Sequence, residues 1–492
     1  MKIAHIIVST QILRATASST FQPSCSIPPE STNLVLAANV RGTFDILWTS
    51  LFTLITCCWT VQHLNVPRQP QKPEDSEQLE KGWRKGFNNI IQIIQRSLLS
   101  ILPKLKWMLL TLLVPEFLVG KSLQDRRLAR KFIADMVDRN GLADDVCHGL
   151  EWAQEHWKMT HGFYVGMGGF AIKTNKSETP IFLNHRSLLY VCGVTRTADV
   201  QPPEVRVTAD KEAIVKELPQ ITEEEIKDKS KSDLFIKIIT IGQLCWFIIQ
   251  AIARGVRGLA IPQLEIAVLA YAACTIITFF LCLSKPKDVQ TPTMLLSKSS
   301  EQFQILSIRD RNELARLHPV SWFKITLRSQ RFFGAQKPPR RTEIILSPIP
   351  NDARYSHKPA MSIFFGKQAL LTHMDDGFFL VGMIFGAIHC ASWYSEFPTT
   401  LEQLLWRVSS VATATLLPAY YILLLIDIHH GWKLILGGVP VLGFILTFFE
   451  MLAILGYILA RLYLVVEIFR SLCFQPSSAF ITTWSSEIPH VA

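Results

Sequence analysis

The sequence predicts an all-α, polytopic membrane protein with about six transmembrane helices, interfacial amphipathic helices and two long cytoplasmic segments. The chain has 492 residues, of which 49% are hydrophobic. Its apolar residues gather in runs of about 17–22 residues, the length that crosses a hydrocarbon core roughly 30 Å thick. Its cations gather between those runs, as they do in cytoplasmic loops. Composition and charge together therefore predict a protein that lives in the bilayer.

The membrane pattern is clearest around the polar turn SEFPTTLEQ, which lies between the apolar runs 378–394 and 408–426. Such an arrangement predicts a hairpin that enters the membrane and returns. Pro398 ends the first helix, and Thr399 followed three residues later by Glu402 has the spacing of a capping box that starts the second. Three aromatic residues fall where an interfacial belt would sit: Trp393, Tyr394 and Trp406.

Seven segments follow in order. They are an N-terminal segment with a candidate signal peptide (1–40), a first span (41–67), an amphipathic helix with a large polar segment (68–233), a two-span hairpin (234–283), a basic polar segment (284–377), a three-span bundle (378–472) and a C-terminal tail (473–492). The signal-peptide pattern ends at Ala15-Thr16-Ala17, and a disordered or interfacial N-terminus is its alternative.

Six spans are expected within these segments, at 46–64, 234–253, 263–283, 378–394, 408–426 and 434–460. Residues 83–102 place apolar side chains on one helical face, which is typical of a helix lying in the membrane interface or on a soluble core. Residues 107–120 are short for a span and contain Pro115-Glu116, which favours a re-entrant or interfacial placement. Within the polar segment, HGFYVGMGGF, PIFL and LLYVCGV indicate a turn and short strands.

The distribution of cations predicts the topology. The formal net charge is +10, and 40 of the 50 Lys and Arg residues lie in 65–233 and 284–377. Six spans place both stretches on one side, which the positive-inside rule assigns to the cytoplasm. A seventh span at 107–120 would separate them. The same excess of cations fits anionic lipid better than nucleic acid, so no nucleic-acid partner is expected.

Motifs for catalysis or for binding a cofactor are not evident. The ten cysteines contain no CxxC, and six of them lie in apolar runs, so neither a disulfide framework nor a zinc site is supported. Asp427 with His429-His430 lacks a third histidine at ligand spacing. The glycines of HGFYVGMGGF are not followed by Lys-Ser/Thr, as a P-loop would require. The sequence names no cofactor and leaves open whether the chain is an enzyme.

Ionisable residues inside apolar runs are the candidate functional residues, because burying them in lipid is costly. Most lie at span ends, where an anchoring or capping role is the simpler interpretation. The candidate catalytic residues are His389, Glu116 and Glu450. Asn175 begins an Asn-Lys-Ser glycosylation sequon, which matters only if its loop is lumenal.

Two further expectations concern the span ends. Arg41 and Asp45 are four residues apart, so they are expected to form an ion pair on the first turn of a helix. The last span continues as a helix through Arg470, with Tyr463, Glu467 and Arg470 expected at the surface.

Several stretches resemble a large family of multi-span fungal integral membrane proteins that has no assigned activity. The stretches are RGTFDILW and WTVQHLNVP within 41–67, KWMLLTLLVPEFLVGK, HGFYVGMGGF, the region 228–272, GAIHCASWYSEFPTTLEQLLWRVSS, and 460–490. The resemblance covers most of the chain and implies a fungal origin and one integral membrane unit. No catalytic residue carries over from it.

Two functions remain open on these grounds. One is an enzyme or accessory factor that acts on a lipophilic small molecule in fungal specialised metabolism, with His389, Glu116 and Glu450 as its polar groups. The other is a non-enzymatic membrane sensor or scaffold whose cytoplasmic segments bind partners. A transporter is less well supported, because we find neither internal repeats nor a pair of broken helices. The expected location is an endomembrane, such as the endoplasmic reticulum, or the plasma membrane.

Overall fold

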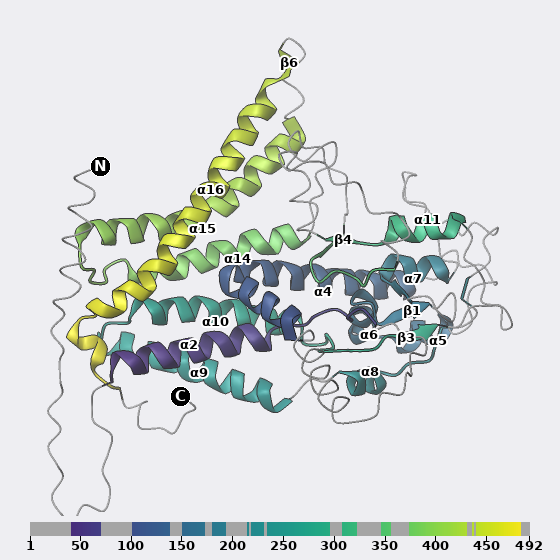
Figure 1. Ribbon diagram of the computed structural model, residues 1–492, viewed down its shortest axis with the longest axis horizontal. Helices are drawn as coiled ribbons and strands as arrows, with labels where there is room; N and C mark the ends of the chain where they lie inside the picture. Colours follow the sequence, from purple (N-terminus) through teal and green to yellow (C-terminus); the bar gives the residue numbers. More distant parts are fainter. Residues whose placement is uncertain are drawn as a thin grey trace, which may run out of the picture.

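The computed structural model describes residues 41–69, 101–137, 150–172, 180–192, 214–215, 218–230, 234–295, 308–321, 346–355, 373–430, 435–436 and 439–483. These residues are mostly helical and build two large hydrophobic cores, with two small clusters beside them. One core lies in a bundle of long helices, and the other lies in a smaller unit that we call the polar domain (Figure 1). Helix α4 (Pro115–Val137) contributes side chains to both.

Six helices form the bundle: α2 (Thr43–Thr60), α9 (Leu234–Val256), α10 (Gln263–Leu281), α14 (His373–His389), α15 (Thr400–His430) and α16 (Val441–Arg470). Helix α10 packs against α2, α9, α14 and α16, so it lies at the centre of the bundle. Helices α15 and α16 form the long hairpin that rises obliquely beside α14 (Figure 1). The short 3-10 helix η1 (Cys390–Ser392) leads into the turn before α15.

Three of the described helices are long and apolar enough to cross a membrane, by length and composition. They cover Lys237–Val256, Gln263–Leu281 and Phe448–Phe474, and Asp376–Ser392 is a shorter apolar helix. The described residues are therefore mostly helical and include helices that could span a membrane, as the sequence predicts.

Small residues allow the helices of the bundle to approach closely. A side chain at Gly386 of α14 would clash with the backbone of Ala414 on α15, and one at Gly382 would lie 2.6 Å from Leu417 Cδ1. At the other end of α14, a Cβ on Gly377 would lie 2.9 Å from the Cα of Gly120 on α4. Cores are packed to near crystal density, so these glycines fix where α14 crosses its two neighbours.

The outer surface of the bundle is apolar. Large hydrophobic side chains are exposed along α2, α9, α15 and α16, including Trp48, Ile241, Val408, Leu455 and Leu462. In a water-soluble protein such a large exposed apolar surface would favour association or aggregation. It is the surface expected of helices in contact with lipid.

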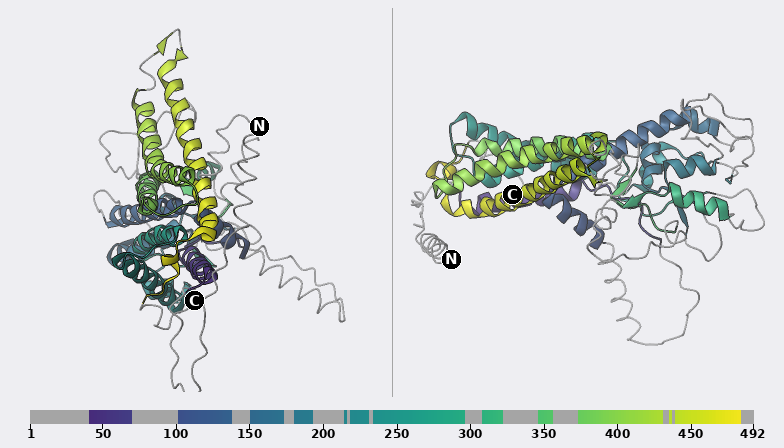
Figure 2. Two further views of the ribbon diagram at one scale, coloured as in Figure 1. Left: turned by 90° about the vertical axis from the view of Figure 1, so that its left-hand side faces the viewer. Right: turned by 90° about the horizontal axis from the view of Figure 1, so that it is seen from above.

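The polar domain is built on the C-terminal half of α4 (Pro115–Val137). Around it lie α5 (Leu150–His156), α6 (Met159–Gly166), α7 (His185–Val191), α8 (Glu223–Lys229) and α11 (Ile308–Leu317). A three-stranded sheet has the order β2-β1-β3, from Ile181–Leu183, Phe170–Ile172 and Thr293–Leu295. A two-stranded sheet pairs β4 (Val320–Ser321) with β5 (Ala353–Arg354). The domain extends beyond one end of the bundle (Figure 2).

The two long polar segments fold together. Strand β1, from the segment 68–233, pairs in parallel with β3, from the segment 284–377, in the register Ala171↔Met294. The side chain of Asn65 also donates hydrogen bonds to the carbonyls of Ile349 and Pro350. Segments that share one sheet lie on the same side of any membrane that the bundle crosses. Both strands follow residues 107–120 in the chain, so their pairing is the same with six spans or with a seventh at 107–120.

Several local expectations change. Residues 107–120 form no single unit, because a helix at 101–113 ends before Pro115, where α4 begins. Most of HGFYVGMGGF belongs to α6, with a turn at Met167-Gly168, and LLYVCGV lies mainly in α7 rather than in a strand. PIFL forms strand β2, as predicted. The chain is thus not purely helical, but each strand in the described residues is only two or three residues long. Short apolar runs fit a buried strand and a buried helix equally well.

The helix caps follow the sequence well. The Thr399 hydroxyl accepts a hydrogen bond from the Glu402 amide at the start of α15, as the capping-box spacing predicts. Helix α8 has the full reciprocal box, in which Thr222 caps the Glu225 amide and the Glu225 carboxylate accepts from the Thr222 amide. The candidate signal peptide in 1–40, the amphipathic helix at 83–102 except for its last two residues, and the sequon at Asn175 lie outside the described residues.

Candidate functional site

Glu116 lies at the first turn of α4, inside the bundle, and is fully buried. The guanidinium of Arg461 on α16 lies 3.4 Å from its Oε1, and the Tyr457 hydroxyl donates to the same oxygen at 3.5 Å. Pro115 leaves no amide hydrogen at the start of the helix, and Val114 interrupts the helical run before it. The broken backbone therefore places a carboxylate at the positively polarised end of a helix, facing a single cation.

Aromatic rings enclose the cation of this pair. The Arg461 guanidinium lies 3.9 Å from the centroid of the Phe385 ring, on α14. The ring of Tyr271, on α10, meets Phe385 edge to face at 5.3 Å, and its hydroxyl donates to the Leu112 carbonyl. Four helices and the segment before α4 thus meet around one charge pair. A buried pair with this many contacts is expensive to break from either side.

His389 lies one helical turn beyond Phe385 and belongs to the same cluster. Its ring packs on Phe385 at 4.7 Å and on Trp406 at 6.0 Å. Its Nδ1 lies 2.8 Å from the Phe385 carbonyl, so Nδ1 carries the proton and Nε2 keeps the basic lone pair. The Trp406 indole donates to the His389 carbonyl at 3.2 Å. His389 and Glu116 are therefore brought together, with Phe385 and Arg461 between them.

Glu450 is buried but does not join this cluster. It lies on α16, seven residues before Tyr457, which is about 10 Å along the helix axis and on the same face. Of the three candidate catalytic residues, the structure brings two into one cluster and leaves the third about two turns away.

Sequence reasoning missed Arg461, and a signal was available. It is the one cation in residues 434–469, and Tyr457 and Arg461 are spaced to share a helix face with Glu450. The last span was expected to end at residue 460, just before Arg461, and the predicted continuation of the helix through Arg470 is confirmed by α16. An isolated arginine within an apolar helix implies a buried partner.

A second cluster lies where α4 leaves the bundle. Asp125 accepts from Lys121, one turn earlier on α4, through Oδ1, and from Lys285, after α10, through Oδ2 at 2.7 Å. Burial alone would raise the pKa of Asp125, but attraction to the two lysines outweighs burial and lowers the pKa to about 2. The pKa of Lys285 rises because attraction to Asp125 exceeds the effect of its burial, whereas burial lowers the pKa of Lys121. We call these three residues the junction cluster.

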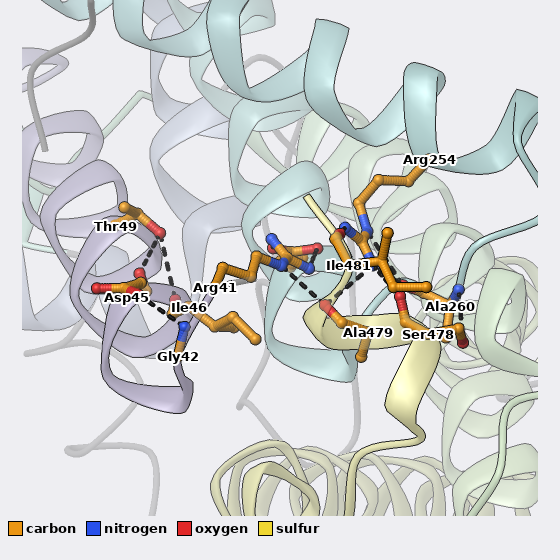
Figure 3. A network of polar contacts seen from close by, with 11 residues as sticks. Arg41, Gly42, Asp45, Ile46, Thr49, Arg254, Ala260, Ser478, Ala479 and Ile481 are labelled. Atoms are coloured by element: carbon orange, nitrogen blue, oxygen red, sulfur yellow. Dashed lines mark hydrogen bonds and ion pairs between the residues drawn. The ribbon is translucent and has the colours of Figure 1, made fainter. Parts of the chain in front are cut away.

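At the opposite end of the bundle, two arginines tie three separate segments together (Figure 3). Arg254 donates to the carbonyls of Ala260, Ser478, Ala479 and Ile481 at 2.7–3.1 Å. Arg41 donates to the Ala479 carbonyl at 2.8 Å and lies 2.5 Å from the carboxylate of Glu265. This network holds the chain before α2, the α9–α10 turn and the 3-10 helix η3 (Ser477–Phe480) in one place.

Three expectations about span ends are wrong. Arg41 pairs with Glu265 rather than with Asp45, whose carboxylate instead accepts from the Gly42 amide and caps α2. Glu467 is buried rather than exposed, and Tyr463 is partly buried, with its hydroxyl donating to the Glu402 carbonyl. Trp406 is fully buried beside His389, although Tyr394 is exposed as an interfacial residue would be. For Arg41 and Tyr463, a partner from a distant segment determines the position of the side chain.

Comparison with known proteins gives one match, to a family described as "Family of unknown function (DUF8562)", over residues 89–311. The matched region contains Glu116 and the whole junction cluster, and it ends before α14. It covers less than half of the chain and fits the resemblance to a family without an assigned activity. Neither the curated proteins nor the solved structures contain a match.

Proposed function

We propose that the six bundle helices α2, α9, α10, α14, α15 and α16 all cross the membrane. Three of them meet the length and hydropathy expected of a span, and the outer faces of α2 and α15 are exposed and apolar like those of α9 and α16. The chain would then be retained in the membrane pellet after carbonate extraction. Release into the supernatant would overturn the proposal.

The topology that goes with six spans places the polar domain in the cytoplasm. Its support is the concentration of cations in 65–233 and 284–377 and the sheet that joins these segments. The helix at 101–113 exposes Leu102, Leu105, Leu109 and Leu113 along one face, as expected of a helix lying in the cytoplasmic interface. In this topology Asn175 carries no glycan. The host membrane is an endomembrane, such as the endoplasmic reticulum, or the plasma membrane.

The function that this architecture supports best is that of an enzyme or accessory factor acting on a lipophilic small molecule. The observation that carries it is the Glu116–Arg461 pair with Tyr457 and His389, a set of ionisable groups kept inside an apolar bundle at a cost in stability. His389 keeps a free lone pair on Nε2 and Glu116 has a hydrogen-bonded carboxylate, so the cluster offers a proton acceptor and a charge for orienting a polar group.

The setting we put forward is fungal specialised metabolism. The test compares products in a strain whose own copy is deleted and then complemented by the wild type, His389→Ala or Glu116→Gln, at matched protein levels. The proposal expects a changed product profile in both variants. An unchanged profile in both would overturn it. Terpene or polyketide enzymes encoded by neighbouring genes would support the setting independently.

A second candidate is a non-enzymatic sensor or scaffold. It is favoured by α4, which places Val119 in the core of the bundle and Phe132 in the core of the polar domain. A shift of α14 against Gly120 would move α4, and with it the surface that the polar domain offers to partners. Co-purification of a specific protein with the wild type, lost on Gly377→Val, would favour this candidate. Retention of membrane localisation by the variant serves as the control.

A further inference from the structure

The junction cluster has more buried positive charge than its one carboxylate neutralises. The side chains of Lys121, Asp125 and Lys285 are 7%, 12% and 5% exposed. Each oxygen of Asp125 accepts from one ammonium, so the carboxylate has a cation on both sides. Two ammonium groups and one carboxylate leave a net positive charge in a site that is nearly closed to water.

The hydrogen bonds of the two lysines are also incomplete. An ammonium group has three N–H donors. Within the ranges that the structure describes, Asp125 is the hydrogen-bond acceptor for both Lys121 and Lys285. Four N–H donors therefore remain, and leaving charged donors without partners in a buried site costs free energy. An additional acceptor that carries negative charge would satisfy both the charge and the hydrogen bonds.

Neighbouring lysines increase the positive charge at the same end of the bundle. Lys287 donates to the Thr60 carbonyl at 2.8 Å, and its burial, together with Lys237 and Lys104, lowers its pKa to about 8. Lys104 pairs with Asp288 at 2.9 Å. Five lysines thus face two aspartates where α2 and α10 end and α9 begins. This is the depth at which lipid headgroups meet the cytoplasm, and basic pockets between helices on this side suit anionic heads.

On the domain side of Asp125, three buried polar atoms have no hydrogen-bond partner among the described residues: Gln124 Oε1, His185 Nδ1 and Tyr355 Oη. His185 Nε2 lies 2.8 Å from the Gly162 carbonyl and so carries the proton, which leaves Nδ1 as an acceptor. The rings of His185 and Tyr355 are 6.3 Å apart. Gln124 Nε2 donates to the carbonyl of Ala353, two residues before Tyr355. These atoms form a second set of groups suited to hydroxyl ligands.

We propose that the junction cluster binds the phosphate-bearing head of an amphiphile whose head has a net negative charge. Lys121 and Lys285 would hold the phosphate, and hydroxyl groups of the head would reach Gln124, His185 and Tyr355. The proposal rests on the proposed function in that it names the polar end of the lipophilic ligand, but binding is measured without any reaction. A change in product profile tests the Glu116 and His389 cluster, whereas binding tests the junction cluster, so the two can fail separately.

The test uses the full-length protein in detergent and follows its unfolding temperature during titration with three probes. These are dihexanoyl phosphatidic acid, dihexanoyl phosphatidylcholine and inorganic phosphate. The proposal expects phosphatidic acid to raise the unfolding temperature at concentrations at which phosphatidylcholine has no effect. A comparable shift with inorganic phosphate would identify the anion as sufficient, and its absence would identify a lipid as the source. No shift with either phosphatidic acid or phosphate would overturn the proposal.

Matched variants separate binding from a purely structural role. Lys121→Gln and Lys285→Gln should each weaken binding of phosphatidic acid by roughly tenfold or more, because each removes a buried charge contact. Lys227→Gln removes the same charge from an exposed pair with Glu223 and should leave binding unchanged. Equal weakening by all three variants would point to nonspecific charge and overturn the proposal.

Asp125→Asn gives the sharpest contrast, because it removes the carboxylate that competes with the ligand for both ammonium groups. The proposal expects Asp125→Asn to be unstable alone, to bind phosphatidic acid several-fold more tightly than the wild type, and to regain stability when the lipid is added. If the variant loses stability and phosphatidic acid neither binds nor restores it, the cluster is a structural ion pair and the proposal fails. Should the glutamine variants not fold, this comparison still decides between the two outcomes.

Discussion

Helix α4 carries two buried carboxylates in different settings, Glu116 in the bundle and Asp125 nine residues later at the junction, about 14 Å along the axis. Glu116 faces one arginine, whose planar guanidinium is covered by an aromatic ring. Asp125 faces two lysines with spare donors. The first setting is balanced in charge and closed by its own side chains. The second has surplus charge, so it suits an external anion.

The largest effect is expected on breaking the balanced pair. Glu116→Gln would leave Arg461 buried without a counter-charge, at a cost of about 3–5 kcal/mol in the free energy of unfolding. The measurement is the unfolding temperature in detergent, with the fraction of monodisperse protein on gel filtration as a second readout. The double variant Glu116→Gln with Arg461→Met is the matched control and should recover much of the loss. A single variant as stable as the wild type would show that the pair contributes nothing to the bundle.

The next largest effect is a pH dependence of stability that comes from His185, which lies near the junction cluster. Burial lowers the pKa of His185 from 6.5 to about 4, so the folded protein keeps this ring neutral. Because the unfolded chain binds the proton first, stability is present above pH 6.5 and falls as the pH drops toward 4, by up to about 3 kcal/mol. The measurement is the free energy of unfolding as a function of pH between 4 and 6.5. The variant His185→Gln keeps a donor for the Gly162 carbonyl but cannot titrate, so its stability should depend less on pH than that of the wild type. Unaltered dependence in the variant would contradict this assignment.

Arg254 illustrates a third environment for a buried charge, because in the described residues its hydrogen-bond acceptors are carbonyl groups. Arg254 is buried and satisfied by carbonyl groups of the α9–α10 turn and of the C-terminal segment. Arg254→Lys keeps the charge but loses the planar fork, so about 1–3 kcal/mol of stability should be lost. Limited proteolysis should then cut the segment after α16 faster than in the wild type. Arg257→Lys, at an exposed neighbouring position, is the control, and equal cleavage of both variants would argue against the network.

The smallest effect is expected where charges are exposed. Lys227 and Glu223 form a pair one turn apart on α8, with the lysine side chain 64% exposed. Lys227→Gln should change stability by less than about 0.5 kcal/mol, because solvent and salt screen such pairs. Thermal unfolding measures it alongside the other variants. A loss of stability as large as that of Glu116→Gln would mean that burial does not determine how much each charged pair contributes to stability.

Local chemistry made part of this fold predictable. Apolar runs predicted the ends of α2, α9 and α10 to within four residues, whereas the ends of α14, α15 and α16 differ from the predicted spans by four to ten. The Thr399 cap was visible as a spacing. The partners of Glu116 and Asp125 were not predictable in this way, because Arg461 and Lys285 are 345 and 160 residues away along the chain. Arg41 shows the limit most clearly, since a carboxylate four residues away was available and a distant one, on Glu265, took its place.

The arrangement of the two polar segments was predictable only in part. The cation count predicted that the two polar segments lie on one side, and their shared sheet supports this. It did not predict that they fold into one domain, because β1 and β3 are three residues each and are separated by α9 and α10. Strands this short gain their stability from the core around them rather than from their own sequence.

The central claim is that both polar segments, 65–233 and 284–377, lie on the same side of the membrane. The accessibility of introduced cysteines tests this directly. The background replaces Cys25, Cys147, Cys245, Cys390 and Cys473 by alanine and keeps the buried native cysteines. Cysteines are introduced one at a time at Glu155 on α5, Arg316 on α11 and Arg257 in the α9–α10 turn. Each is labelled with a membrane-impermeant maleimide before and after permeabilisation of the plasma membrane alone, which leaves internal membranes sealed. We predict that positions 155 and 316 react together once the cytosol is opened and that position 257 does not. Labelling of 155 and 316 from opposite sides would contradict the fold and every role assigned to it.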